Sequence, residues 1–275
     1  MWATLALAAA LQSIPAQPGA FALKNVRASY SVLGQTRKEA KYLGGDLIIV
    51  NYELQNLKVA EDGTIHYSIT IDISTKARKS VFKLEPQEFK AELSLGGTTR
   101  PALSIYELPI DIPSGDYIFT ITGTDLLAKS TNTLEFPFEV LSPRLGFIQS
   151  GLHIPVGQSL MPTAAMIPVG QTIIVGTGVV GFELGPKTEK DEKKRQPYLT
   201  IETRIIEEAT GKATQAKPKS GGVTMVGEEF RKIIPFTTPL ELNRPGRYKI
   251  EMKVTDKHAN KTAELTLDVT VYEVK

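Results

Sequence analysis

The sequence predicts an all-β protein made of two tandem β-sandwich domains. A block of sequence occurs twice, since Tyr117 and Asp125 return as Tyr248 and Asp256, in each case 131 residues later. Short alternating apolar runs separated by turn residues fill most of the chain, and no stretch combines a sustained helical period with caps at both ends. Short strands without crossover helices favour sandwiches over a parallel α/β sheet.

The repeat covers more than one hairpin and indicates a duplicated unit. Further pairs share the spacing of 131, namely Gly115 and Gly246, Leu134 and Leu265, and Val140 and Val271. Upstream blocks match at other spacings: Gly45 with Gly170, the run 69–71 with 199–201, and Pro109 with Pro239. The changing spacing places insertions in the loops between strands.

In the first half, strands are expected over residues 23–32, 48–54, 67–73, 80–84, 89–95, 117–121 and 134–140. The run from Tyr67 to Ile73 alternates apolar and polar residues with a period of two, which is typical of a half-buried strand. Asp62-Gly63 between two alternating runs predicts a hairpin. Gly96-Gly97 and the stretch 113–115 predict further turns.

The second half repeats these elements from Leu145 and ends in the hairpin opened by Arg244-Pro245-Gly246. Its main difference is a longer loop over 185–197, which carries eight charged residues. Such a segment lacks apolar residues to bury, so it is expected to be solvated and mobile.

We expect domains over 21–141 and 145–275, joined by a linker at 142–144, with a signal peptide at 1–20. The apolar run from Trp2 to Leu11 is followed by small residues and proline, as in a secretory signal, with cleavage after Ala16 or at 20–22. No Lys or Arg precedes the run, and an N-terminal extension of a cytoplasmic protein is the alternative. The signal predicts a secreted or periplasmic protein.

Composition limits the classes of partner. The net charge of +2, from 32 basic and 30 acidic residues, gives no field that would attract nucleic acid. The absence of cysteine excludes disulfides and thiolate metal sites. No other segment has about 18 consecutive apolar residues, so the chain is not expected to span a membrane.

The repeated block resembles the last two strands of bacterial immunoglobulin-like, PKD-like and fibronectin-type sandwiches. The matching pattern is a glycine, a tyrosine two residues later, alternating apolar residues and a Thr-Asp pair; it runs from Gly115 and again from Gly246. In these families the tyrosine hydroxyl often bonds upstream backbone, so the resemblance implies structural roles for Tyr117 and Tyr248. The disulfide and buried tryptophan of antibody domains are absent.

Several motifs suggest chemistry on first sight. Residues 176–181 spell GxGxxG after an apolar run, but a dinucleotide site needs a helix there, and none is predicted. The glycines are expected to bend or flatten a strand. Asp125 and Asp256 are expected to bond their own turn backbone, with calcium loops as the alternative. The three histidines, at 66, 153 and 258, fall in separate elements without metal-ligand spacing.

No catalytic, cofactor or metal residue is therefore assigned, and the first hypothesis is a non-enzymatic module for protein interaction or envelope structure. Its expected contact surface is the tract from Leu152 to Val180, which has few charges, with Ile167 and Val169 as contact residues. A carbohydrate-binding or accessory module of a hydrolase is the alternative, with tyrosines 30, 42 and 106 as possible stacking residues. An enzyme is a third, weaker alternative.

Overall fold

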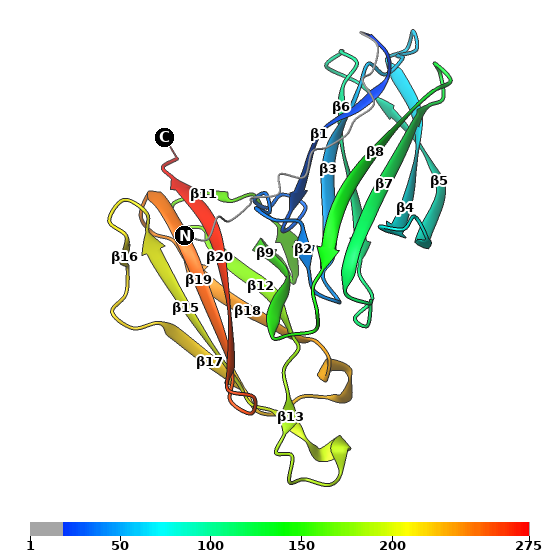
Figure 1. Ribbon diagram of the computed structural model, residues 1–275. Helices are drawn as coiled ribbons and strands as arrows, with labels where there is room; N and C mark the ends of the chain where they lie inside the picture. Colours follow the sequence, from blue (N-terminus) through cyan, green and yellow to red (C-terminus); the bar gives the residue numbers. More distant parts are fainter. Residues whose placement is uncertain (1–18, 275) are drawn as a thin grey trace, which may run out of the picture.

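The computed structural model describes residues 19–274, which form two β-sandwiches in tandem (Figure 1). Only Gly19 and Ala20 of the expected signal peptide lie within the described residues. The helices of this range are two short 3-10 turns, η1 (Glu192–Lys194) and η2 (Glu228–Phe230). No helix in the described range is long and apolar enough to cross a membrane.

Domain 1 consists of a three-stranded and a five-stranded sheet. The first has the order β1-β3-β6, with β1 (Ala22–Ser29), β3 (Leu47–Gln55) and β6 (Arg100–Glu107). The second has the order β2-β8-β7-β4-β5, with strands β2 (Lys41–Tyr42), β4 (Thr64–Thr75), β5 (Ser80–Glu92), β7 (Gly115–Asp125) and β8 (Ser130–Val140). The last two strands pair with each other and then with β4, as in immunoglobulin-like sandwiches.

Domain 2 repeats this topology. One sheet has the order β10-β9-β12-β18, with strands β9 (Gly146–Val156), β10 (Ser159–Pro162), β12 (Thr172–Val180) and β18 (Ile234–Glu241). The other has the order β11-β20-β19-β15, with strands β11 (Met166–Pro168), β15 (Leu199–Glu207), β19 (Gly246–Asp256) and β20 (Lys261–Tyr272). On the outer side of β15 lie β16 (Lys212–Ala213) and β17 (Lys219–Val223), and β13 (Leu184–Gly185) pairs with β14 (Gln196–Pro197).

The pairing registers define which residues of the two domains are equivalent. β1 and β9 correspond with a spacing of 124, because Ala22 pairs with Gln55 as Gly146 pairs with Val180. In both domains a short strand pairs in parallel with the last strand, β2 with β8 and β11 with β20. The two domains are therefore one sandwich built twice, and the fold class predicted from the sequence is confirmed.

Two of the expected sequence matches are wrong in register. Asp125 pairs with Tyr67 and Asp256 pairs with Leu199, so Leu199 corresponds to Tyr67, two residues before Ile69. β3 pairs Ile49 with Ile105, and β12 pairs Ile174 with Pro239, so Pro239 corresponds to Ile105 and not to Pro109. Both shifts are even numbers of residues, which keep inward and outward positions unchanged.

Asp62-Gly63 does not form the expected hairpin. The strands on either side, β3 and β4, belong to different sheets and do not pair. Residues 56–63 instead cross the end of the sandwich, and Leu57 within them is 2% exposed. A turn does form there, with the Gly63 N–H bonded to the Ala60 carbonyl oxygen, but it belongs to a crossover whose Leu57 side chain is buried. The expected strands at 80–84 and 89–95 are likewise one strand, β5, with a register shift.

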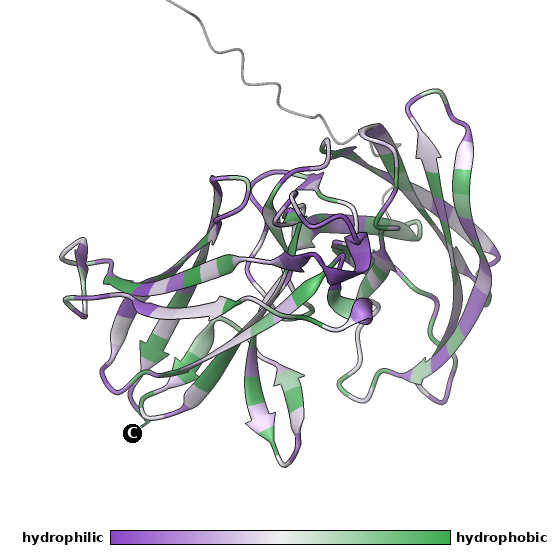
Figure 2. Ribbon diagram, turned by 90° about the horizontal axis from the view of Figure 1, so that it is seen from below, coloured by the Kyte–Doolittle hydropathy of each residue, from purple (hydrophilic) through white to green (hydrophobic). Residues whose placement is uncertain are grey.

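Each domain has its own core. Inward positions of β3, β4, β7 and β8 fill the first, and inward positions of β12, β15, β19 and β20 fill the second. Hydrophobic and hydrophilic residues alternate along the strands accordingly (Figure 2). The charged loop of domain 2 is not free of the domain surface, since the Arg231 guanidinium donates to the carbonyl oxygens of Glu192, Lys193 and Arg195.

Candidate functional site

The two repeated tyrosines close equivalent corners. The Tyr117 hydroxyl donates to the carbonyl oxygen of Pro113 at 2.8 Å, and the Tyr248 hydroxyl donates to that of Arg244 at 3.1 Å. Gly115 and Gly246 open the corners with φ of 148° and 149°, where a side chain would be strained. These contacts tie β7 and β19 to the loops that precede them.

The two repeated aspartates fasten loops. Asp125 is fully buried, and its carboxylate accepts three backbone N–H groups: those of Leu127 and Ala128 in its own turn, and that of Lys58 at 2.7 Å. Asp256 does the same in domain 2, where it accepts from residues 258, 259 and 183. Their oxygens are directed at backbone donors rather than at a shared centre.

The GxGxxG segment lies in and directly after strand β12. Gly176 and Gly178 pair with β18 on one side and β9 on the other, and a helix does not follow. A Cβ on Gly176 would lie 3.0 Å from the His153 ring, so the glycine makes room for this histidine. His66 pairs with Glu88, and His258 is exposed on its turn. Among residues 19–274, no three His, Asp or Glu side chains gather in a way that could hold a metal ion.

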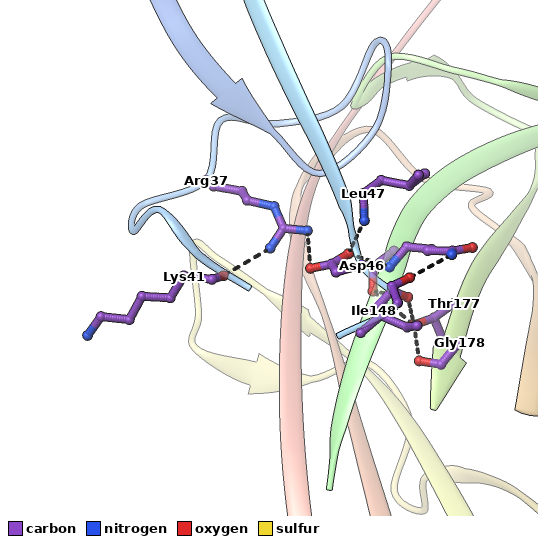
Figure 3. A network of polar contacts seen from close by, with 10 residues as sticks. Arg37, Lys41, Asp46, Leu47, Ile148, Thr177 and Gly178 are labelled. Atoms are coloured by element: carbon purple, nitrogen blue, oxygen red, sulfur yellow. Dashed lines mark hydrogen bonds and ion pairs between the residues drawn. The ribbon is translucent and has the colours of Figure 1, made fainter. Parts of the chain in front are cut away.

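An interdomain joint, which the sequence did not predict, holds the two sandwiches together (Figure 3). Its centre is an ion pair between Arg37 and Asp46, with 2.8 Å between Nη2 and Oδ2 and with both side chains buried. The guanidinium lies 4.5 Å from the ring centroids of both Tyr30 and Tyr42, so a cation–π sandwich adds to the ion pair.

The same carboxylate reaches across to domain 2. Asp46 Oδ1 accepts the backbone N–H of Gln149 at 2.8 Å, in addition to that of Leu47. Gln149 lies in a bulge of β9 with φ of 50°, and its side-chain amide donates to the carbonyl oxygen of Gly45. Burial raises the pKa of Asp46, whereas Arg37 and the two N–H donors oppose this shift.

Two further contacts complete the joint. A small apolar cluster contains residues from both domains: Leu43, Ile110, Leu141, Ile148, Val180 and Ile233. The segment after β1 reaches further, because the Gln35 side chain donates to the Thr266 carbonyl and accepts the N–H of Asp268 on the edge of β20 that faces away from β19. Gly151 permits this approach, since a Cβ there would lie 2.8 Å from the Cβ of Ser31.

The tyrosines expected as alternative stacking residues are not exposed together. Tyr42 is 1% exposed, and Tyr30 and Tyr106 are half-buried. Tyr30 and Tyr42 enclose Arg37 and so belong to the joint. A row of exposed tyrosines, as the carbohydrate hypothesis requires, is not formed by these residues.

Ile167 is not a contact residue, and this expectation is corrected. Ile167 is 1% exposed, because β11 pairs with β20 and places the side chain in the core of domain 2. Val169 is half-buried against the same core. Along an apolar run without charges, the sequence alone did not distinguish inward from outward positions.

The exposed side chains of the same tract lie elsewhere. Residues 145–182 contain no Asp, Glu, Lys or Arg. Val156, Leu160, Met161 and Met166 on β9, β10 and β11 are 54%, 43%, 51% and 63% exposed, and Tyr272 at the end of β20 is 43% exposed. We call these five residues the free end of domain 2.

Domain 1 contains a cavity of about 720 Å³. Its lining includes the apolar residues Val81, Tyr106 and Ile112 and the charged residues Lys79 and Asp111. The loop that forms it differs between the domains: six residues separate Leu108 from Gly115, but only three separate Leu242 from Gly246. The cavity is of the size that small ligands occupy.

Comparisons with known proteins give a fold likeness only. No protein-family model matches the chain, and no curated protein matches it. One similar solved structure is the CARDB domain of a Pyrococcus furiosus protein in complex with di-metal ions. It has 14% identity and a TM-score of 0.27, and the match covers 48% of this chain and 93% of that one.

The C-terminal domain of an antigen I/II-family protein of Streptococcus pyogenes has 9% identity and TM-score 0.30, with 91% and 99% coverage. Red sea bream transglutaminase has 9% identity and TM-score 0.27, with 96% of this chain but only 31% of that chain covered.

Proposed function

We propose that the protein is a non-enzymatic interaction module of the bacterial immunoglobulin-like type, secreted or periplasmic, which binds another protein through the free end of domain 2. The observation that carries the proposal is the exposure of five large apolar side chains, four of which lie in the stretch 145–182 that contains no Asp, Glu, Lys or Arg. Exposed apolar side chains that adjoin one another on a monomeric protein are commonly part of a binding site.

The interdomain joint supports the same role. The hydrogen bond from Gln149 to Asp46, the Gln35 contacts with β20 and an apolar cluster from both domains fix one domain against the other. The ion pair within domain 1 holds the Asp46 carboxylate in place for this contact. A binding surface carried on a fixed pair of domains loses less conformational entropy on binding than one carried on a flexible pair.

The test is a photo-crosslinking amino acid placed at Met161 of the full chain in the cell that makes it. We expect one discrete adduct with a protein. The matched control carries the same amino acid at Met225, which is 80% exposed in a loop of domain 2, and should give no such adduct. Equal labelling at the two positions would refute the proposed surface.

The cavity of domain 1 supports a second candidate, a carbohydrate or other small ligand. In its lining, Tyr106 offers an aromatic ring, and Lys79 and Asp111 offer charged groups. Retention on immobilised polysaccharide that is lost in Tyr106→Ala would favour this candidate. Retention that is unchanged in this variant, or absent, would remove it.

A further inference from the structure

The free end of domain 2 is equivalent to a surface of domain 1, and in domain 1 that surface is covered by domain 2. Gly45 and Gly170 open the equivalent turns with φ of 83° and 82°. Each donates its N–H to an equivalent carbonyl oxygen, that of Leu108 for Gly45 and that of Leu242 for Gly170. The turn at 43–46 contacts domain 2 in the interdomain joint. The turn at 168–171 is its equivalent in domain 2, and no further domain covers it in the described structure.

The neighbouring elements correspond as well. Leu141, in the apolar cluster of the joint, is equivalent to the exposed Tyr272 through the spacing of 131. The segment 30–36, which reaches over to β20, is equivalent to the tip of the β9–β10 hairpin, residues 154–162, because Arg37 and Thr163 make the same backbone bond to Ala28 and Leu152. This hairpin carries Val156, Leu160 and Met161.

One chemical difference between the two surfaces lies at the ion pair. The positions of the ion pair, Arg37 and Asp46, are occupied in domain 2 by Thr163 and Gln171. The buried charges are therefore replaced by neutral polar groups, and the surrounding residues are methionines and tyrosine. Methionine adapts its shape to an apolar partner surface.

A second copy of the chain does not offer the matching half. In the joint, domain 2 presents Ile148, Val180 and Ile233. The pairing registers place Lys24, Gln55 and Thr99 at these positions in domain 1, so the corresponding end of domain 1 is polar. In every copy, the cluster of Ile148, Val180 and Ile233 is already covered by domain 1 of the same chain.

From this equivalence we infer that the free end of domain 2 docks a further immunoglobulin-like domain, one whose first strands present an apolar cluster like that of Ile148, Val180 and Ile233. The inference rests on the proposed function and specifies the partner. The side-chain oxygen of Gln171 takes the place of the Asp46 carboxylate as acceptor for a bulged backbone N–H of the partner, as Asp46 accepts from Gln149.

The chain itself supplies the probe. A copy of residues 142–275 is attached directly after Tyr272, which reproduces the Leu141–Ser142 junction. The attached copy carries Met161→Leu and Met166→Leu, so that oxidation at positions 161 and 166 is reported by the inner domain alone. We expect Met166 of the inner domain to be oxidised by dilute peroxide about tenfold more slowly than in the two-domain chain, as for a contact closed nine-tenths of the time.

Two variants of the three-domain chain control the measurement. Met166→Glu in the inner domain should separate the outer domain, which small-angle scattering would record as a larger and more variable maximum dimension. Met225→Glu, at a methionine that is 80% exposed but remote from this end, should leave the compact shape unchanged. The contact should persist in high salt because it contains no ion pair.

Unchanged oxidation of Met166 together with a flexible outer domain would overturn the inference. Self-association of the unmodified chain that Met166→Glu abolishes would assign the surface to a second copy and would also overturn it. If the three-domain chain does not fold, a crosslinker at Met166 decides: an adduct within a β-sandwich domain supports the inference, and an adduct with any other kind of protein refutes it while the proposed function stands.

Discussion

Asp46 of domain 1 accepts the backbone N–H of Gln149 of domain 2 at 2.8 Å while its other carboxylate oxygen binds Arg37. A single buried side chain thus serves two purposes. It neutralises a buried guanidinium, and it fixes the position of the first strand of the neighbouring domain. Both domains depend on it, although they have separate cores.

Removal of this carboxylate should destabilise the protein and release the joint. Asp46→Ala leaves Arg37 buried without a counter-charge, so we expect a loss of about 3 kcal/mol in the free energy of unfolding. Urea denaturation measures the loss, and scattering measures the change in shape. Asp116→Ala, which breaks the exposed pair with Lys76, is the control and should cost less than about 1 kcal/mol. Equal losses would contradict the role of the joint.

Alkaline pH should destabilise the fold through two buried tyrosines. Burial raises the pKa of Tyr42 and of Tyr52 from 10.0 to about 12. The folded state thus holds these protons more tightly than the unfolded state. The stability is fully present below pH 10 and falls between pH 10 and 12, by about 1.4 kcal/mol per pH unit for each tyrosine.

Tyr42→Phe tests this dependence. The Tyr42 hydroxyl is buried without a hydrogen-bond partner in the described structure, so the variant should be about as stable as the parent at pH 7. Its urea midpoint should fall less steeply above pH 10. An unchanged slope would show that Tyr42 ionises as readily in the folded as in the unfolded state.

The aspartates that bond three backbone N–H groups should be structural. Asp256→Ala leaves the donors of residues 183, 258 and 259 without their acceptor, and we expect a loss of about 3 kcal/mol or more. Chelators should not change the melting temperature of the parent protein, because backbone donors occupy the carboxylate oxygens. A melting temperature lowered by EDTA and restored by calcium would refute this assignment.

The proposed signal peptide has to be removed before Phe21. Phe21 is 4% exposed in the core of domain 1, and Asn56 donates its side-chain amide to the Ala20 carbonyl. We expect mass spectrometry of the exported protein to find its first residue at or before Phe21. Phe21→Ala should cost about 3 kcal/mol by leaving a cavity. A mature chain that begins after Phe21 and is equally stable would contradict the observed packing.

Sequence patterns predicted the sandwiches but not the surfaces. Alternation and turn residues identify strands, because burial of one face requires a period of two. Alternation is unchanged by a shift of two residues, so the sequence pattern alone aligns Leu199 with Ile69 as readily as with its true equivalent, Tyr67. The joint links residues 103 positions apart, and its left-handed residue is Gln149, which has none of the preference for φ above zero that glycine has. No local signal reveals such a contact.

The longer loop of domain 1 has a consequence for the order of the domains. Ile110 lies in this loop and fills the joint, and the shorter loop of domain 2 has no counterpart. In a chain with the order of its domains exchanged, Thr163 and Gln171 would face Lys24 and Gln55. Neither Ile110 nor the Arg37–Asp46 ion pair would lie at this contact. Such a permuted protein should keep both sandwiches folded, but the two domains should move independently of each other.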